Sequence, residues 1–579
     1  MGQGDAVSWQ RRQFLGATAA TAATLLAGCD APRVLDGGFT GMDMARGHQL
    51  RELLKSGNLP APAVQRRTRV LIAGGGVAGL AAARSLRLAG VEDFALLELE
   101  DHAGGNSRGG AVGGMACPLG AHYLPLPGDD ALEVQDLLEE LGLRQRVAGR
   151  WQYDERHLCH SPQERLYWRG AWQAGLLPVQ DVGAASLAQY QRFAALVDKL
   201  RQQTRFAMPA FTQYQPNRPL DQAQRALDAI TFDAWLGQNG LDDAHLRWYL
   251  NYCCRDDYGT GSARVSAWAG IHYFASRHGF SAPGSAAEAD DDSDGSNGAQ
   301  QPDGVLTWPE GNGWLTRQLA TPLQAAGQLH TGCSVLRISE GRHGVEVDAL
   351  NHATHQVERW QAQRCIVALP VFVAARVVHN PPDFLTAAAQ RLQWAPWLVA
   401  NVHLDRPLQD RPGAAPAWDN VLYQDDNTGG LGYVDAGHQR LSPLPAATVI
   451  SYYQALGDKP DGRAQLQQQP WTHWRGAILR SLSQPHPDIA QRATRMEITR
   501  YGHAMAVPTP GMQHFLSQIG LQPFKHGRYQ LSNGERARRL PTPASARLAF
   551  AHSDWSGYSV FEEALTRGHA AGLHALHAL

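Results

Sequence analysis

The sequence predicts an α/β fold, in which a Rossmann-type domain with a parallel sheet is interrupted twice by an inserted α+β domain. A short apolar run at residues 69–73 ends in glycines and leads into an Ala-rich stretch, as a buried parallel strand followed by a helix would. Residues 150–305 then become helical and aromatic, and strand-like runs return at 333–369 and 548–551. At 579 residues, the chain is too long for a single compact core.

These signals divide the chain into segments that alternate between two domains. The segments assigned to the parallel-sheet domain are 68–150, 306–384 and 511–579. Those assigned to the inserted domain are 151–305 and 385–510. Within the first insertion, the acidic stretch 281–304 is expected to be a disordered surface loop, because it offers almost no apolar residues to bury.

Composition excludes several classes of function. The formal net charge is −2 and no basic run exists beyond the N-terminus, so we expect no nucleic-acid partner. No C-x-x-C or H-E-x-x-H spacing occurs, and no metal site is predicted. Apart from Cys29, six cysteines remain, an even number that permits disulfides without requiring them. The adjacent Cys253 and Cys254 are interpreted as ordinary helix residues.

The N-terminus has the form of an export signal. Arg11 and Arg12 precede a weakly apolar stretch, 16–26, that is too short to span a bilayer, as in a twin-arginine (Tat) signal. Cys29 ends a segment that resembles a bacterial lipobox, and Asp30 resembles an inner-membrane retention signal. Residues 1–29 are therefore predicted to place the protein on the periplasmic side of the inner membrane, anchored by lipid on Cys29.

Between this signal and the first sheet strand lies a stretch with no clear periodicity. Residues 30–66 are predicted to be a tether that carries one short helix at 44–55.

Residues 74–79 fit the pattern G-x-G-x-x-G directly after the first strand. Gly74 permits a tight turn, Gly76 lets the backbone approach a pyrophosphate, and Gly79 lets helix and strand pack closely. Val77 and Ala78 open the helix, whose N-terminus attracts phosphate charge. The pattern therefore predicts a dinucleotide site.

An acidic residue stands where such a site needs one. Glu98 ends the next strand, 94–97, nineteen residues after Gly79, and is placed to accept hydrogen bonds from the adenosine ribose. This evidence alone permits either NAD or FAD.

Six residues after Glu98 come Gly104 and Gly105, and this spacing resembles the flavin-containing amine oxidase superfamily. That superfamily includes monoamine and polyamine oxidases, protoporphyrinogen oxidase and phytoene desaturases. The resemblance implies FAD as cofactor, a GR2-like FAD-binding domain, and a second close approach to the pyrophosphate at the glycine pair. Asn106 stands where this superfamily usually has an arginine after the glycine pair. Arg108, two residues later, is expected to make the charge contact of that arginine instead.

Further resemblances are spread along the chain. Val335 matches the position whose backbone meets the adenine. Residues 551–572 resemble the C-terminal flavin segment, with Ser553 or Asp554 as the ribityl ligand. The helix N-terminus near Phe561 and Glu562 is expected to face the flavin ring and to stabilise its reduced, negatively charged form. No cysteine occurs in 366–579, which argues against a thioether link to flavin through this segment.

The resemblance also predicts catalytic positions, with departures from the family pattern. The lysine that holds a water near the flavin corresponds to Asn401, and the position of the C-terminal cage tyrosine corresponds to Val560. Tyr558, two residues earlier, could serve only if the backbone turns. His122 is expected to lie close to the flavin. Two helical segments, 256–258 and 272–273, could line the pocket.

The function predicted from these residues is two-electron oxidation of an organic substrate, with an amine as the first candidate, by hydride transfer to noncovalent FAD. One alternative is desaturation or isomerisation of a lipid-like polyene, which a membrane anchor would suit. Another is a flavoprotein that carries electrons or assists assembly without catalysis. The expected partner is thus a small-molecule or lipid-like substrate. The sequence does not distinguish between oxygen, a quinone and a protein as the electron acceptor.

Replacing both Arg11 and Arg12 with Lys should block export, because the Tat route reads the paired guanidinium groups rather than the charge alone. Fractionation of cells into cytoplasm and periplasm measures the outcome, with Arg33→Lys as a control. Undiminished periplasmic delivery of the double variant would refute the Tat interpretation.

Overall fold

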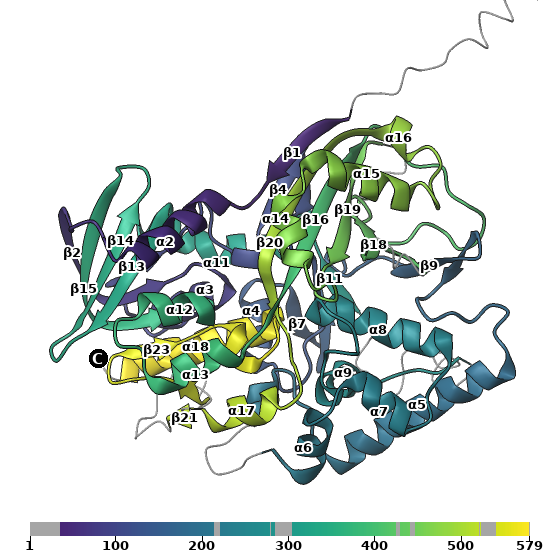
Figure 1. Ribbon diagram of the computed structural model, residues 1–579, viewed down its shortest axis with the longest axis horizontal. Coiled ribbons are helices and arrows are strands. Elements are labelled where there is room, and N and C mark those ends of the chain that lie inside the picture. Colours follow the sequence, from purple (N-terminus) through teal and green to yellow (C-terminus); the bar gives the residue numbers. More distant parts are fainter. Residues whose placement is uncertain are drawn as a thin grey trace, which may run out of the picture.

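The computed structural model describes residues 35–213, 220–277, 279–283, 304–423, 429–440, 446–519, 521–522 and 540–577. The signal segment 1–29 and most of the acidic stretch 281–304 lie outside the described residues. Two lobes stand side by side, each built on its own sheet, with a group of helices below the second sheet (Figure 1).

The first sheet is the predicted parallel one. In spatial order its strands are β12 (Leu329–His330), β3 (Phe94–Leu97), β2 (Val64–Ala73), β15 (Gln356–Val367), β14 (Val345–Asn351) and β13 (Cys333–Glu340), with β23 (Leu548–Phe550) beside the end of β15. The neighbours β12, β3, β2, β15 and β23 run parallel, whereas β13, β14 and β15 form an antiparallel meander. The α/β fold with its Rossmann-type sheet is thereby confirmed.

Helices cover both faces of this sheet. Val70 and Ile72 of β2 pack on one side against α3 (Val77–Leu88), α4 (Leu132–Glu140), α11 (Gly313–Ala325) and α18 (Phe561–His577). Leu71 and Ala73 pack on the other side against α12 (Val371–Val377), α13 (Asp383–Arg391) and α17 (Met512–Gln518). Burial of both faces explains why β2 ends in an unbroken apolar run rather than an alternating one.

The second sheet belongs to the inserted domain. Its strands, in spatial order, are β1 (Asp36–Thr40), β20 (Ala493–Ala506), β16 (Trp394–Leu404), β19 (Thr448–Ala455), β18 (Gly430–Asp435), β17 (Asp419–Leu422), β9 (Glu164–Trp168) and β10 (Ala171–Ala174). One face packs on α14 (Gly462–Gln468), α15 (Trp471–Leu482) and α16 (Ile489–Arg492). The other face meets α5 (Ala184–Gln203), α6 (Gln222–Asp228), α7 (Phe232–Gln238), α8 (Ala244–Tyr258) and α9 (Ala267–Ala275).

Short strand pairs complete the structure. They are β4 (Gly109–Val112) with β5 (Met115–Pro118), β6 (Tyr123–Pro125) with β11 (Val305–Thr307), β7 (Arg144–Val147) with β8 (Arg150–Tyr153), and β21 (Leu521–Gln522) with β22 (Thr542–Pro543).

Two expectations need correction. Part of the predicted tether, residues 30–66, is integral to the fold: β1 pairs in parallel with β20, and the last residues of the stretch begin β2. The short helix expected there is α2 (Met44–Ser56). Residues 150–305, expected to lack further strands, supply β9 and β10 at the edge of the second sheet.

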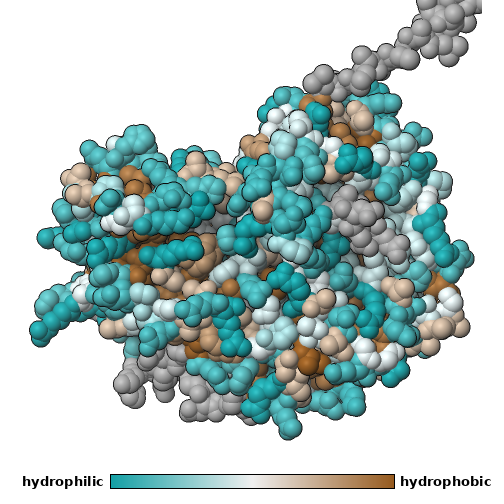
Figure 2. Space-filling view, viewed as in Figure 1, coloured by the Kyte–Doolittle hydropathy of each residue, from teal (hydrophilic) through white to brown (hydrophobic). Residues whose placement is uncertain are grey.

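The six cysteines within the described residues are buried and free, and Cys253 and Cys254 lie on α8 as predicted. Within the described residues, no helix combines the length and apolar character that a bilayer-spanning segment needs. Hydrophilic residues predominate on the face shown in Figure 2, with hydrophobic residues gathered in patches.

Glycines let the C-terminal helix lie directly on α3. A Cβ atom at Gly568 of α18 would lie 2.0 Å from the carbonyl oxygen of Ala78, and one at Gly572 would lie 2.8 Å from Cβ of Ser85. Both distances are shorter than van der Waals contact. The position of α3, and with it the glycine turn at its N-terminus, therefore depends on bare backbone in α18.

Gly568→Ala should destabilise the protein by about 1–3 kcal/mol, because the new methyl group forces the two helices apart. The matched control is Gly476→Ala in α15, whose Cβ would meet only the mobile end of Arg480 at 3.3 Å. That change should be neutral or slightly stabilising, since Ala favours a helix interior over Gly. Thermal unfolding measures both, and equal midpoints for the two variants would contradict the account.

Candidate active site

The G-x-G-x-x-G turn is held in a geometry that only glycine can adopt. Gly74 has a φ of 104°, and a Cβ atom there would lie 2.4 Å from the carbonyl oxygen of Ala368. At Gly79 a Cβ atom would lie 1.9 Å from the carbonyl oxygen of Gly74. These two glycines thus serve the tight turn and the close packing predicted for them.

Gly76 has a different environment, because the space beside it is open. A Cβ atom there would meet only Cα of Gly105, at 3.9 Å. Gly76 and Gly104 form a parallel bridge, and the amide of Gly104 donates to the carbonyl of Gly75 at 2.8 Å. The two glycine segments are therefore hydrogen-bonded neighbours, and together they border an open space lined by bare backbone, here called the glycine gap.

The N-terminus of α3 opens into this gap. Gly76 is its N-cap and supplies no side-chain hydrogen bond, so the first amide groups of the helix, at Val77 and Ala78, have no capping acceptor from that residue. Unpaired amides and the positive end of the helix dipole favour an anion there. The gap has the backbone lining and the charge preference that a pyrophosphate requires.

Glu98 lies beside the gap, 7% exposed. Its Oε2 accepts from the amide of Gly75 and its Oε1 from the amide of Glu100, both at 2.8 Å. Burial raises the pKa of Glu98, and these two bonds oppose the rise. A carboxylate has about four acceptor positions, so two remain for hydroxyl donors such as those of a ribose.

A cavity of about 610 Å³ joins these groups to the inserted domain. The residues predicted to bind the cofactor that line it are Gly74, Gly76, Val77, Ala78, Glu98, Gly104, Gly105, Asn106, Arg108, Val335, Ser553, Asp554, Phe561 and Glu562. Gly79 is absent from the lining because it packs inside the turn. The structure thus brings together residues from all three sequence segments of the first domain.

Asn106 and Arg108 carry structural contacts as well. The amide of Asn106 donates to the carbonyl of Ala504 at 2.7 Å. The guanidinium of Arg108 donates to the carbonyl of Gly105 at 3.1 Å and to that of Gly41 at 2.6 Å. Arg108 is therefore directed toward the N-terminal segment, and its predicted phosphate contact stays a prediction.

The C-terminal residues close another side of the cavity. Oδ2 of Asp554 accepts from the amide of Val371 at 2.9 Å. Burial would raise the pKa of Asp554, but His552 and this amide lower it, so the carboxylate is ionised. Glu562 lies in the first turn of α18, where burial raises its pKa and Arg277 opposes the rise.

Aromatic rings line the inner part of the cavity. His122 stacks on Tyr453 with ring centroids 4.4 Å apart and lies 5.0 Å from Tyr123. Trp397 and Tyr501 also face the cavity. Burial lowers the pKa of His122 to about 3, so its imidazole is neutral at physiological pH.

Two carboxyl groups end α8 at the same place. Asp256 and Asp257 both line the cavity, and the guanidinium of Arg277 lies 3.5 Å from Asp257. Among the described residues, Asp256 has no ion-pair partner within 4.0 Å. Burial and, less strongly, the neighbouring charge of Asp257 raise the pKa of Asp256 to about 7.

Residues 77–571 match the family model described as flavin containing amine oxidoreductase. The chain belongs to this family. FAD is accordingly its cofactor, and the paired glycine segments, Glu98 and the cavity between the domains fit that group. The protein is an FAD-dependent oxidoreductase of the amine oxidase type. The predicted alternative of a flavoprotein that carries electrons or assists assembly without catalysis is therefore set aside.

Solved structures of flavin amine oxidases share the fold at low sequence identity. A wild-type putrescine oxidase bound to putrescine matches with a TM-score of 0.61 and 17% identity, over 88% of this chain and 99% of that one. Cyclohexylamine oxidase from Brevibacterium oxydans IH-35A matches with 0.58 and 15%, over 88% and 98%. A CLA-producing fatty acid isomerase from P. acnes matches with a TM-score of 0.55 and 15% identity, over 87% of this chain and 97% of that one. No curated protein matches the chain in sequence.

Two predicted catalytic residues of this oxidoreductase lie away from the cavity. Asn401 is fully buried in β16, where its amide donates to the carbonyl of Pro118 at 2.9 Å and accepts from Ser451 at 2.5 Å. Both ends of the amide are thus occupied by the protein. Asn401 is not among the residues that line the cavity, and its side chain bridges neighbouring segments, so this geometry lends no support to the catalytic role predicted for it.

Tyr558 is also buried, 1% exposed, and its hydroxyl bonds to Glu563. It packs edge-on against Tyr258 in the core of the inserted domain. Tyr558 is not among the residues that line the cavity, so this arrangement lends no support to the cage role predicted for it. Val560, the position matched to the cage tyrosine, does line the cavity.

Sequence reasoning missed several cavity residues. Tyr453 lies on β19, a strand that was not predicted, and Arg277 lies beyond the two helical segments named as candidates. Of the two helical segments named as candidates, Asp256 and Asp257 line the cavity. His272 instead bonds to the carbonyl of Ala207 at 2.7 Å and stacks on Trp268.

Gly76→Val should abolish flavin loading, because its side chain would fill the gap toward Gly105 that the pyrophosphate needs. Flavin absorbance of the purified protein, relative to protein absorbance, measures the loading. Gly183→Val is the control: its Cβ meets nothing within 4 Å, and it should load flavin as the native chain does. Normal loading of Gly76→Val, in a folded protein, would place the cofactor elsewhere.

Proposed function

We propose that the protein oxidises an organic amine, with hydride transfer from the carbon next to nitrogen to noncovalent FAD. This proposal rests on the position of the Asp256 carboxyl group in the cavity. That group faces the cavity, while the neighbouring Arg277 lies within ion-pair distance of Asp257. A partly buried carboxylate that lacks a cation of its own among the described residues favours a cationic ligand.

The surroundings of Asp256 strengthen this preference. Asp257 and Glu562 add carboxyl groups to the same cavity, against the guanidinium of Arg277. Both aspartates lie at the C-terminal end of α8, where the helix dipole is negative. The aromatic rings of Tyr123 and Tyr453 offer faces that attract an ammonium group and exclude water from it.

Removal of a hydride requires the neutral amine, so a group in the cavity must take the ammonium proton. Efficient proton acceptors have a pKa near the working pH. Asp256, with a pKa of about 7, meets this condition, whereas His122, with a pKa of about 3, is too weak a base. We therefore assign the proton to a carboxylate oxygen of Asp256, and to His122 the role of a neutral ring that holds the substrate in place.

A second candidate, action on an unsaturated fatty acid, is favoured by one observation. Nε of Arg277 is buried without a hydrogen-bond partner among the described residues, and it could receive a carboxylate. The fold shared with a fatty acid isomerase is compatible with this candidate. The acidic residues around Arg277 oppose it, because a fatty acid would bring one more negative charge beside Asp256.

We also propose that the protein acts outside the cytoplasm, exported through its paired arginines and anchored by lipid on Cys29. The support is the sequence of residues 1–29. Because the Tat route carries folded proteins, it suits a chain that must bind FAD in the cytoplasm before export. The electron acceptor stays open between oxygen, a quinone and a protein.

Asp256→Asn should lower kcat/KM for amine oxidation by about ten- to a hundredfold, the cost of losing a charged hydrogen bond to the substrate. Flavin content should not change. In the native enzyme, kcat/KM should rise with pH through about 7 as Asp256 becomes ionised, and this rise should vanish in the variant. Anaerobic bleaching of the flavin by a panel of monoamines, diamines and unsaturated fatty acids measures substrate choice.

The control is Asp233→Asn, which removes an exposed carboxylate whose partner is Arg247 on the surface of the inserted domain. It should leave both kcat/KM and the pH profile unchanged. An unaltered kcat/KM in Asp256→Asn, or bleaching by fatty acids alone, would overturn the amine proposal.

A further inference from the structure

A segment outside the family match contributes to the cofactor cavity. The family model begins at residue 77, whereas Asp36–Ser56, which comprises β1 and α2, precedes it. We call this segment the N-terminal clasp. Its helix α2 lies on the first domain near β13 and its strand β1 lies on the second domain, so it joins the two lobes (Figure 1).

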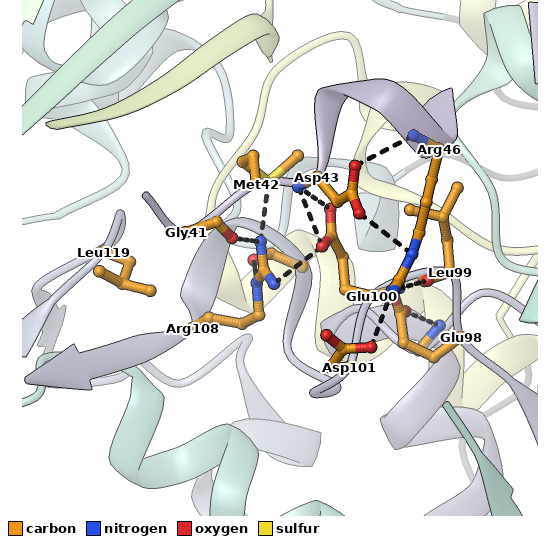
Figure 3. Close-up of polar contacts among 12 residues, drawn as sticks. Gly41, Met42, Asp43, Arg46, Glu98, Leu99, Glu100, Asp101, Arg108 and Leu119 are labelled. Carbon is orange, nitrogen blue, oxygen red and sulfur yellow. Dashed lines mark hydrogen bonds and ion pairs between the residues drawn. The ribbon is translucent and has the colours of Figure 1, made fainter. Parts of the chain in front are cut away.

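The clasp binds the end of β3, where Glu98 stands (Figure 3). The amide of Asp43 donates to both carboxylate oxygens of Glu100, at 3.2 Å each. Nη1 of Arg46 donates to the carbonyl of Leu99 at 3.0 Å and to Asp101 at 2.8 Å. From the other side, Arg108 reaches the carbonyl of Gly41. These contacts hold the three residues that follow Glu98, and Glu100 among them donates its amide to the Glu98 carboxylate.

Residues of the clasp also line the cavity itself. Met42, Asp43, Gly47 and His48 share it with Gly76 and Glu98. The clasp thus forms the wall of the cavity at the adenosine end, the end marked by Glu98 and Val335. If the clasp served only to join the two lobes, its residues would not need to line this cavity.

The clasp is held more weakly than the elements it covers. Within α2 only Leu50 is fully buried. An isolated helix of this length is marginally stable in water, so α2 depends on its docking. Leu50, with the partly buried Leu53 and Leu54, packs on the first sheet, and the polar contacts just described add to this small apolar contact. At the other end, among the described residues, β1 pairs with β20 alone, at the edge of the second sheet. Such an element can detach while both cores stay folded.

We infer that the N-terminal clasp is part of the FAD site: it closes over the adenosine end of the bound cofactor and must detach before FAD enters or leaves. The clasp sets the rate of FAD release, whereas the glycine gap and Glu98 determine whether FAD binds at all.

Two variants detach the clasp without touching the residues of the glycine gap. In Gly37→Val, the new Cβ would lie 1.8 Å from the carbonyl oxygen of Met496, so β1 cannot dock on β20. Arg46→Ala removes the bonds to Leu99 and Asp101. The matched controls are Gly38→Val, whose Cβ meets nothing within 4 Å, and Lys55→Ala, whose partner Glu52 lies on the same exposed helix face.

The measurement is the rate of FAD release from purified holoprotein, followed by flavin fluorescence with an excess of an apoflavoprotein as trap. Both clasp variants should release FAD about tenfold faster or more, the effect of losing about one charged hydrogen bond. Both controls should match the native rate. Trypsin should cleave after Arg51 and Lys55 faster in apoprotein than in holoprotein, because the clasp is open without FAD.

Native release rates in both Gly37→Val and Arg46→Ala would overturn the inference, as would equal acceleration in the controls. Equal trypsin cleavage of apo- and holoprotein at the clasp would overturn its closure over the cofactor. If Gly37→Val fails to fold, Arg46→Ala decides the question, because it removes side-chain contacts of the clasp and introduces no clash.

Discussion

The backbone of Gly76, Gly104 and Gly105 borders the glycine gap, and the rest of the site is arranged around this space. Gly74 and Gly79 fix the turn that brings Gly76 there, and Gly568 lets α18 hold α3 behind it. Glu98 reaches the same place through two backbone amides. A dinucleotide needs such an arrangement because its pyrophosphate requires close backbone amides and its ribose an acceptor beside them.

The inserted domain supplies what the first domain lacks, a chemical preference for the substrate. Its helix α8 brings Asp256 and Asp257 to the cavity, and the turn after α9 brings Arg277. Its sheet brings Trp397 and Tyr453. The first domain contributes His122 and Tyr123 to the same wall. Substrate choice therefore depends on how the two lobes are held together, and the N-terminal clasp is one of the elements that join them.

Residues whose roles follow from backbone geometry could be predicted from the sequence. The glycine pattern, Glu98 and the strands at 69–73 and 94–97 were readable because local spacing alone determines them. Asn401 and Tyr558 were predicted to face the substrate but do not line the cavity, because the direction of a side chain depends on its packing partners. Asn401 bonds to Pro118, which is distant in sequence, and Tyr558 bonds to Glu563 in the helix that follows it. The strand β1 was missed because Asp-Gly-Gly-Phe-Thr has no strand pattern of its own and becomes a strand by pairing with β20.

The central claim is that FAD lies with its pyrophosphate in the glycine gap and its adenosine ribose on Glu98. A crystal structure of the flavin-loaded protein tests it most directly. The account predicts density for the pyrophosphate in the glycine gap, against the backbone of Gly76 and Gly105, with ribose hydroxyls within hydrogen-bond distance of the Glu98 carboxylate. Density that shows the gap filled by side chains, or the flavin bound with Glu98 turned away, would contradict it.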